Sequence, residues 1–385
     1  MQVFLSLLLC ISMLAWPTKI YAEGTSLESS RSYVVMELQS GQVLKEHNMN
    51  DAIPPASITK IMTMLLINEA VASGKIHWDD NVTVSEHAAG MGGSQVFMEE
   101  GEQQTVRDLL KCIAISSAND AAVTMAEHIG GSEPQFVDLM NKKAQELGMK
   151  DTTFKNACGL HVDGHVSSAY DVALMSRELM IKYPEMTKTL TTWMDSIIHR
   201  TRKGESEFGL SNTNKMLKWY SGITGLKTGY TPEAKHCVSA TATRNGMSLV
   251  AVVLGGSDSK TRFREAGRLL DYGFANFTVK QGPQVGDIVG EATVEKGKSD
   301  TVNATVENSM TFVVAKGAVS DDPQYEIIFD ESIVAPIYKG QKIGTLKYVV
   351  SDEETAEENL VAMEDVEKRG FKIFSKFKNM FKKDK

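Results

Sequence analysis

Short apolar segments flank turn residues at two widely separated places in the chain. Near the start, residues 33–36 and 42–44 lie on either side of a Ser-Gly pair, and this arrangement predicts a β-hairpin. Much later, residues 238–243 and 249–254 flank Asn-Gly, a pair favoured in two-residue hairpin turns. Both ends of one domain therefore contribute strands.

Between the two hairpins, apolar residues recur at helical spacing. Thr105 and Asp108 form a capping-box pattern ahead of one such segment, and a further helical pattern covers residues 263–274. Gly74 falls where the C-cap of an earlier helix is expected. The apolar positions of that earlier helix are Ile58, Ile61, Met62, Leu65 and Leu66. A sheet built from both ends of the domain, with helices inserted between, accounts for this order better than a repeating βαβ pattern.

From about residue 279 the composition shifts to short strands separated by Gly and Asp turns. Residues 280–350 are therefore interpreted as a small all-β domain without catalytic character. The predicted strands include residues 301–306, 311–315, 325–329 and 345–350.

Two segments of contrasting charge follow. Residues 352–367 are rich in carboxylates and poor in large apolar side chains, which predicts an acidic linker or a solvated helix.

Residues 370–385 divide on a helical wheel into a lysine side and an apolar side, with Phe371 out of place. We expect this last segment to be an amphipathic helix that lies in a membrane interface, its lysines on anionic lipids. A terminal helix packed on its own domain is the alternative. The apolar side consists of Ile373, Phe374, Phe377, Met380 and Phe381.

The first residues resemble a signal peptide. An apolar run over residues 4–16 is followed by Tyr21-Ala22 and then Glu23, so we expect residues 1–22 to be removed. The run is too short to span a bilayer comfortably as an uncleaved anchor. The expected location is outside the cytoplasmic membrane, with the protein held peripherally on its outer face by the C-terminal helix.

Composition narrows the class of protein. With 385 residues, 42% of them hydrophobic and 23% charged, the chain has the make-up of an ordinary globular protein with one large and one smaller domain. The formal net charge of −8 argues against nucleic acid as a partner.

Cysteine and histidine give no metal or disulfide pattern. Once the predicted signal peptide with Cys10 is removed, the remaining cysteines are Cys112, Cys158 and Cys237. This odd number of widely spaced cysteines contains no CxxC pair, so we interpret them as packing residues. His161 and His165 flank Asp163 in a loop, but no helical HExxH-like arrangement supports a metal site there. Neither a metal nor another cofactor is predicted.

The candidate chemistry begins with Ser57 and Lys60. Two prolines precede them and place Ser57 at the start of the first predicted helix. Residues three apart share a helix face, so the Lys60 amine can reach the Ser57 hydroxyl and supply a base without histidine. The helix N-terminus adds N–H groups where negative charge would develop on an attacked carbonyl. By itself such a tetrapeptide is weak evidence for a catalytic site, because it arises by chance in many helices.

Two later motifs strengthen the evidence that Ser57 and Lys60 are catalytic. Ser117-Ala118-Asn119 follows a predicted helix, where a loop can present a hydroxyl and an amide. Lys227-Thr228-Gly229 precedes the strand at residue 238 and suits an edge strand that faces a cleft. Each alone can be a capping group or a solvated residue. The ordered occurrence of all three motifs is far more specific than any one of them: Ser-x-x-Lys, then Ser-x-Asn, then Lys-Thr-Gly.

The ordered triple resembles the signature of penicillin-binding proteins and class A β-lactamases. Over residues 28–277 the chain resembles the low-molecular-mass penicillin-binding proteins that are serine-type D-Ala-D-Ala carboxypeptidases. Residues 154–160 also look typical of these enzymes, with Cys158 at a position where the family favours His or a small polar residue. The resemblance implies an α/β (α+β) penicillin-binding/serine β-lactamase-like domain with an antiparallel sheet and a helical insert.

The resemblance also implies roles. Ser57 would attack the carbonyl between two D-alanines of a peptidoglycan stem peptide, and Lys60 would take its proton. Ser117 would relay a proton to the leaving amine, and Asn119 would hold the substrate amide or position Lys60. Lys227 and Thr228, followed by Gly229, would bind the terminal carboxylate, and the N–H groups of Ser57 and Tyr230 would form the oxyanion hole.

Two alternatives remain beside the carboxypeptidase. A class A β-lactamase carries the same motifs plus a glutamate that activates the deacylating water. Residues 152–160 contain no acidic residue, and Glu133 follows Asn119 too closely. We therefore expect β-lactams to acylate Ser57 and leave slowly. A non-catalytic cell-wall-binding protein is disfavoured because it would have no use for both Lys60 and Lys227.

Overall fold

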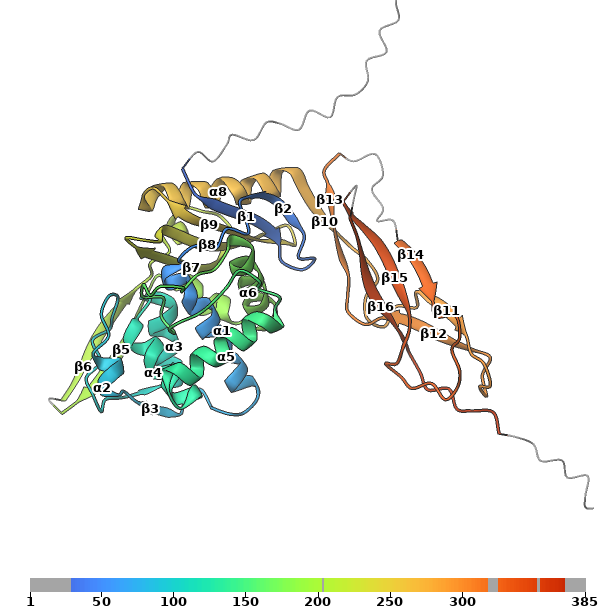
Figure 1. The fold of residues 1–385 in the computed structure, drawn as a ribbon, viewed down its shortest axis with the longest axis horizontal. Helices are drawn as coiled ribbons and strands as arrows, with labels where there is room; N and C mark the ends of the chain where they lie inside the picture. Colours follow the sequence, from blue (N-terminus) through green and yellow to red (C-terminus); the bar gives the residue numbers. More distant parts are fainter. Residues whose placement is uncertain (1–28, 203, 318–324, 352–353, 371–385) are drawn as a thin grey trace, which may run out of the picture.

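A computed structural model describes residues 29–202, 204–317, 325–351 and 354–370. Its central sheet is antiparallel and joins strands from both ends of the first domain (Figure 1). This confirms the predicted sheet and both hairpins. The strand order is β2 (Val43–His47), β1 (Ser32–Glu37), β9 (Met247–Gly256), β8 (Lys235–Arg244) and β7 (Ile223–Thr231), which places β7 at an edge.

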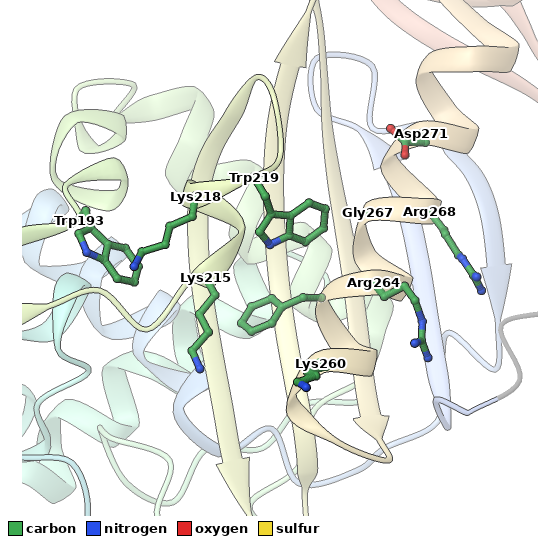
Figure 2. A pocket seen from close by; sticks show the side chains of 10 residues that line it. Trp193, Lys215, Lys218, Trp219, Lys260, Arg264, Gly267, Arg268 and Asp271 are labelled. Carbon is green, nitrogen blue, oxygen red and sulfur yellow. The ribbon is translucent and has the colours of Figure 1, made fainter.

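Alternating side chains of the sheet enter two different cores. Tyr33 and Val35 of β1 pack with α8 (Ser259–Asn276) on one face. Val34 and Met36 point to the other face, where α6 (Ala169–Lys182) and the helical region cover the sheet. The helix η2 (Lys215–Lys218) precedes Trp219, which lies beside α8 (Figure 2).

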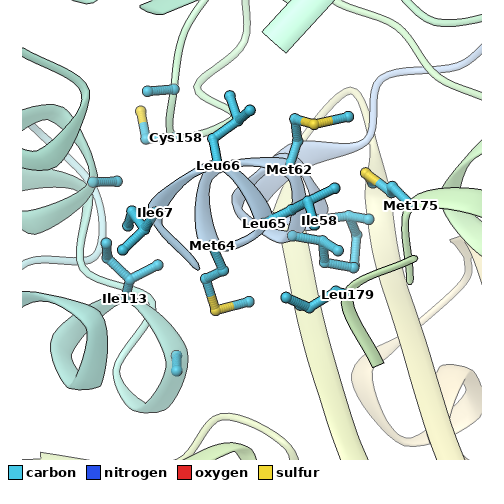
Figure 3. Packing of buried hydrophobic residues seen from close by; sticks show 14 of the residues in the cluster. Ile58, Met62, Met64, Leu65, Leu66, Ile67, Ile113, Cys158, Met175 and Leu179 are labelled. Carbon is cyan, nitrogen blue, oxygen red and sulfur yellow. The ribbon is translucent and has the colours of Figure 1, made fainter. Parts of the chain in front are cut away.

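The helical region is built around α1 (Lys60–Ala72), which is buried along nearly its whole length because other helices and loops surround it (Figure 3). A 3₁₀ turn, η1 (Ala56–Thr59), leads directly into it. The Thr105 side chain accepts a hydrogen bond from the Asp108 N–H and caps the following helix, as predicted. The other helices are α2 (Glu86–Ala89), α3 (Val106–Ile115), α4 (Asn119–Gly130), α5 (Glu133–Glu146) and α7 (Met186–Thr191).

Two antiparallel strand pairs in this region were not predicted. One pairs β3 (Asn81–Thr83) with β4 (Gln103–Thr105), and the other pairs β5 (Met194–Thr201) with β6 (Gly204–Ser211). Most side chains of β5 and β6 are exposed or half-buried, so these strands lack the apolar alternation that identifies a strand in the sequence.

The C-terminal part forms an all-β unit with its own core, as predicted. The strand β10 (Phe277–Gln281) pairs with β13 (Thr311–Ala315). A separate antiparallel sheet has the order β11 (Gly290–Thr293), β12 (Thr301–Val306), β16 (Glu354–Ala362), β15 (Lys342–Ser351) and β14 (Tyr325–Phe329).

The prediction of a linker or solvated helix over residues 352–367 is wrong. Residues 354–362 form β16, an interior strand of the C-terminal sheet, and Leu360, Ala362 and Val366 are buried. The carboxylates suggested a solvated segment, but Glu357 lies on the surface of the strand and pairs with Lys347. A few apolar side chains at the right positions outweigh the acidic composition.

The predicted signal peptide and amphipathic helix, residues 1–22 and 370–385, lie outside the described residues apart from residue 370. Within the described part of the chain, no helix has the length and apolar character needed to cross a membrane.

Candidate active site

Ser57 sits in η1, directly before α1, and its side chain is half-buried. Ala56 adopts a left-handed backbone conformation, with φ of 49°, which is uncommon for a residue with a β-carbon. Because Ser57 and Lys60 are three residues apart along this turn, the Lys60 ammonium reaches the Ser57 hydroxyl at 3.0 Å. The contact expected from the spacing is present.

The Lys60 side chain is fully buried and has three polar partners. Besides Ser57 Oγ, its Nζ donates to Asn119 Oδ1 at 2.6 Å and to the carbonyl oxygen of Cys158 at 2.7 Å. Burial lowers the pKa of Lys60 to about 8, although Cys158 and Asp120 act in the opposite direction. The amine can therefore lose its proton at moderately alkaline pH.

Ser117 lies in the short loop between α3 and α4 with φ of 62°, a left-handed conformation. Its Oγ accepts a hydrogen bond of 2.8 Å from Lys227 Nζ, which comes from the edge strand β7. Burial, followed by the charges of Lys60 and Arg262, lowers the pKa of Lys227 well below its usual value. Two buried lysines thus each contact a serine hydroxyl.

The amide of Asn119 is fixed at both ends. Its oxygen accepts from Lys60, and its Nδ2 donates to the carbonyl oxygen of Gly92 at 2.6 Å. This pair of contacts defines the orientation of the amide and leaves its oxygen beside the lysine. Of the two roles expected for Asn119, the contact with Lys60 is the one present in this arrangement.

The strand β7 passes directly against the Ser57 turn. A β-carbon at Gly229 would lie only 2.9 Å from the carbonyl oxygen of Pro55 and 3.0 Å from the backbone nitrogen of Ser57. Thr228 donates to the Thr213 hydroxyl at 2.8 Å, and Tyr230 is 56% exposed at the next position. The glycine allows the approach that brings the three motifs together.

The loop over residues 154–160 completes the surroundings of Lys60. Asn156 Oδ1 accepts from the backbone N–H groups of Cys158 and Gly159, at 3.2 and 2.6 Å, and holds the loop in a tight turn. Gly159 has φ of 86° and packs so closely on Ala56 that a β-carbon would collide with the Ala56 carbonyl oxygen. Cys158 contributes its backbone carbonyl, while its thiol is buried and forms no disulfide.

Arg262 is a residue of the site that the sequence analysis missed. It is buried in α8, and its Nη1 donates to the carbonyl oxygens of Gly229, at 2.8 Å, and Cys237, at 3.1 Å. It thus places a cation behind β7. The available signal was its position four residues before buried Ala266, on the apolar face of the predicted helix.

Comparison with known proteins identifies the family. The family model for D-alanyl-D-alanine carboxypeptidase matches residues 21–258. The chain belongs to the D-alanyl-D-alanine carboxypeptidase family. A second model, the C-terminal domain of penicillin-binding protein 5, matches residues 277–368. The predicted family and fold are confirmed.

Relatives and solved structures of this carboxypeptidase family are similar to this chain over most of its length. D-alanyl-D-alanine carboxypeptidase DacF of Bacillus subtilis is 44% identical, covering 96% of this chain and 96% of the relative. DacC of Escherichia coli is 33% identical, covering 92% and 89%. The crystal structure of penicillin-binding protein 5 from Haemophilus influenzae matches with a TM-score of 0.77 and 33% identity, covering 88% of this chain and 98% of that chain.

Residues considered for other roles are already engaged in this carboxypeptidase. His165 is buried, and its two ring nitrogens contact Thr59 Oγ1 at 2.8 Å and the backbone N–H of Lys155 at 3.0 Å. No group of metal-ligating side chains occurs among the described residues. Glu133 accepts from the N–H of Ala157 at 2.9 Å and contacts His87 at 2.9 Å, so both its oxygens have partners.

Proposed function

We propose that this chain is a serine-type D-alanyl-D-alanine carboxypeptidase in which Ser57 is the nucleophile. It removes the terminal D-alanine from peptidoglycan stem peptides through an acyl-enzyme. The observation that carries this proposal is the contact of 3.0 Å between Ser57 Oγ and Lys60 Nζ, in a setting where the pKa of Lys60 is lowered to about 8. A neutral lysine beside a serine hydroxyl is a general base next to its nucleophile.

In the acylation step, neutral Lys60 accepts the Ser57 proton while Oγ bonds to the carbonyl carbon between the two D-alanines. The C–N bond then breaks, and the leaving nitrogen takes up a proton to depart as D-alanine. We assign this delivery to the Ser117 hydroxyl, which accepts a hydrogen bond from Lys227. The proton that Lys60 took from Ser57 replaces the one that Ser117 gives up, so the step is balanced. Water subsequently hydrolyses the ester.

The remaining residues orient the substrate. The backbone N–H groups of Ser57 and Tyr230 form the oxyanion hole, which the packing of Gly229 against the Ser57 nitrogen supports. Lys227 and the Thr228 hydroxyl bind the terminal carboxylate, whose negative charge favours the protonated form of Lys227 and offsets the effect of burial on its pKa. Arg262 stabilises this strand by binding the Gly229 carbonyl, and its charge adds to the attraction for a carboxylate.

We test this assignment with residues 23–385 in detergent, a peptide ending in D-Ala-D-Ala and a labelled penicillin. D-alanine release and covalent labelling are expected, and Ser57→Ala should lose both. Ser206→Ala, at an exposed position on β6, is the matched control and should keep both. Label retained by Ser57→Ala would contradict the assignment. Rapid turnover of penicillin would favour a β-lactamase instead.

We also propose that the protein is exported and attached peripherally to the outer face of the cytoplasmic membrane. The support is the apolar start of the chain and the basic amphipathic pattern of residues 370–385. Deleting residues 370–385 should release the protein from vesicles that contain anionic lipid. Unchanged vesicle binding after the deletion would contradict the C-terminal anchor.

The chain is proposed to divide into a catalytic domain, residues 28–277, and a β-rich domain that extends from about residue 280 through β16. Separate hydrophobic cores support this division.

A further inference from the structure

A pocket of about 740 Å³ lies between η2 and residues 260–271 of α8, outside the network around Ser57 (Figure 2). Three aromatic side chains line it: Trp193, Trp219 and Phe263. The indole of Trp219 is 56% exposed, although its edge rests on Gly267 of α8. An exposed tryptophan over a concave surface offers a flat face to a ligand.

Cations surround these rings. All five basic residues that line the pocket are exposed, and none has a carboxylate within ion-pairing distance among the described residues. Asp271, the carboxylate in the lining, already accepts from Tyr220 and Arg244 at 2.8 and 3.1 Å. In a chain with a net charge of −8, this group is a local excess of positive charge. The five are Lys215, Lys218, Lys260, Arg264 and Arg268.

Both walls of the pocket are attached to β7. On the η2 side, Asn214 donates to the carbonyl oxygen of Gly225 at 3.1 Å, one residue before Lys215. On the α8 side, Arg262 binds the Gly229 carbonyl, one residue before Phe263. A ligand in the pocket would therefore contact elements that are fixed to the strand bordering Ser57.

We propose that this pocket is an exosite for the glycan strand of the polymeric substrate, a sugar chain whose attached peptides carry free carboxylates. Pyranose rings present C–H faces that stack on Trp219, and the five cations complement the carboxylates. A concave, ring-lined pocket suits a chain-like ligand better than the flat surface of a bilayer. The inference rests on the proposed carboxypeptidase function, because it concerns how the same enzyme holds its polymeric substrate.

The test compares two substrates that share one peptide end. One is a short free peptide ending in D-Ala-D-Ala, and the other is soluble glycan strands bearing that peptide. Lys215→Gln with Arg268→Gln, and separately Trp219→Ala, should raise KM for the strands about fivefold or more. The kcat for the strands should stay within about twofold, because binding is lost equally in the ground and transition states. The kcat/KM for the short peptide should also stay within about twofold, because that peptide carries no glycan to occupy the pocket.

The matched control removes two exposed charges elsewhere, with Lys142→Gln and Lys150→Gln, and should leave KM for the strands unchanged. Thermal unfolding of each variant separates a folding defect from a binding defect. Unchanged KM for the strands, or an equal loss on both substrates, would overturn the exosite. The exosite would also be overturned if the pocket variants lost binding to anionic phospholipid vesicles while their KM for the strands stayed unchanged. Failure of the unmodified enzyme to release D-alanine from the short peptide would contradict the proposed function itself.

Discussion

Lys227 and Ser117 come from opposite sides of the site, yet the lysine Nζ donates to the serine Oγ over 2.8 Å. Lys227 lies on the edge strand of the sheet, and Ser117 in a loop of the helical region. Each is buried, so this hydrogen bond links the edge of the sheet to the helical region inside the site. Ser117 makes this contact from a left-handed backbone conformation.

Removing the Ser117 hydroxyl should slow acylation by about 10² to 10⁴, the usual contribution of a positioned proton donor. Ser117→Ala and Ser117→Gly both lack the hydroxyl, but glycine tolerates the φ of 62° without strain. We therefore expect equal losses in the rate of penicillin acylation and a higher melting temperature for the glycine variant. Near-normal acylation by Ser117→Gly would mean that the backbone, rather than the hydroxyl, is what matters.

Gly159→Ala should disrupt the site through the backbone. The new β-carbon would collide with the Ala56 carbonyl oxygen, which belongs to the turn that carries Ser57. We expect a loss of more than about 3 kcal/mol in the free energy of unfolding, measured in urea, and of most penicillin labelling. Gly164→Ala is the matched control, since φ is 78° there but the nearest atom, in the Lys155 side chain, is 3.6 Å away. It should cost only about 1–2 kcal/mol of backbone strain and keep the label. Equal effects would show that backbone strain alone accounts for Gly159.

Much of the fold could be predicted because its strands alternate and its turns have specific residues. Asn245 and Gly246 both have positive φ, as the turn between β8 and β9 requires. The predicted residues 301–306, 311–315 and 325–329 coincide with β12, β13 and β14. The polar hairpin β5–β6 and the acidic strand β16 escaped because their stability comes from neighbours that local composition does not report.

The candidate site, like the fold, could be predicted only in part. Ser57 and Lys60 could be paired because their spacing fixes their relative position on a helical turn. The carbonyl of Cys158 could not be found, since a backbone oxygen leaves no mark on residue identity. Arg262 was overlooked because a helical pattern gives the buried face, but not the strand against which that face packs.

Leu360→Ala tests whether β16 is a core strand. Leu360 is fully buried in the C-terminal sheet, so truncation should destabilise that domain by about 2–5 kcal/mol. Penicillin labelling at 25 °C should persist, because the catalytic domain has separate cores. Limited proteolysis would show faster cleavage beyond residue 277. Glu357→Ala removes only a surface ion pair of the same strand and should cost less than about 1 kcal/mol. Equal proteolysis of the two variants would contradict a core position for Leu360.

The rate of acylation should depend on pH through Lys60. The base acts in its neutral form, and its pKa is about 8, so the rate should fall about tenfold for each pH unit below 8 and level off above it. A labelled β-lactam without a titrating group between pH 6 and 9 reports acylation alone, and thermal unfolding over the same range checks that the fold is intact. A rate independent of pH from 6 to 9 would be incompatible with Lys60 as the base.

Asn119→Asp should move this profile in a defined direction. The Asn119 oxygen already lies 2.6 Å from Lys60 Nζ, so a carboxylate there would place a full negative charge beside the ammonium. An opposite charge at this distance favours the protonated lysine and raises its pKa by about one unit or more. The midpoint of the acylation profile should therefore shift to higher pH, with a recoverable rate at the alkaline end. Asn119→Ala removes the contact without adding charge and should lower the rate without an alkaline shift. If Asn119→Asp lowered the rate equally at every pH, the titrating group would not be Lys60.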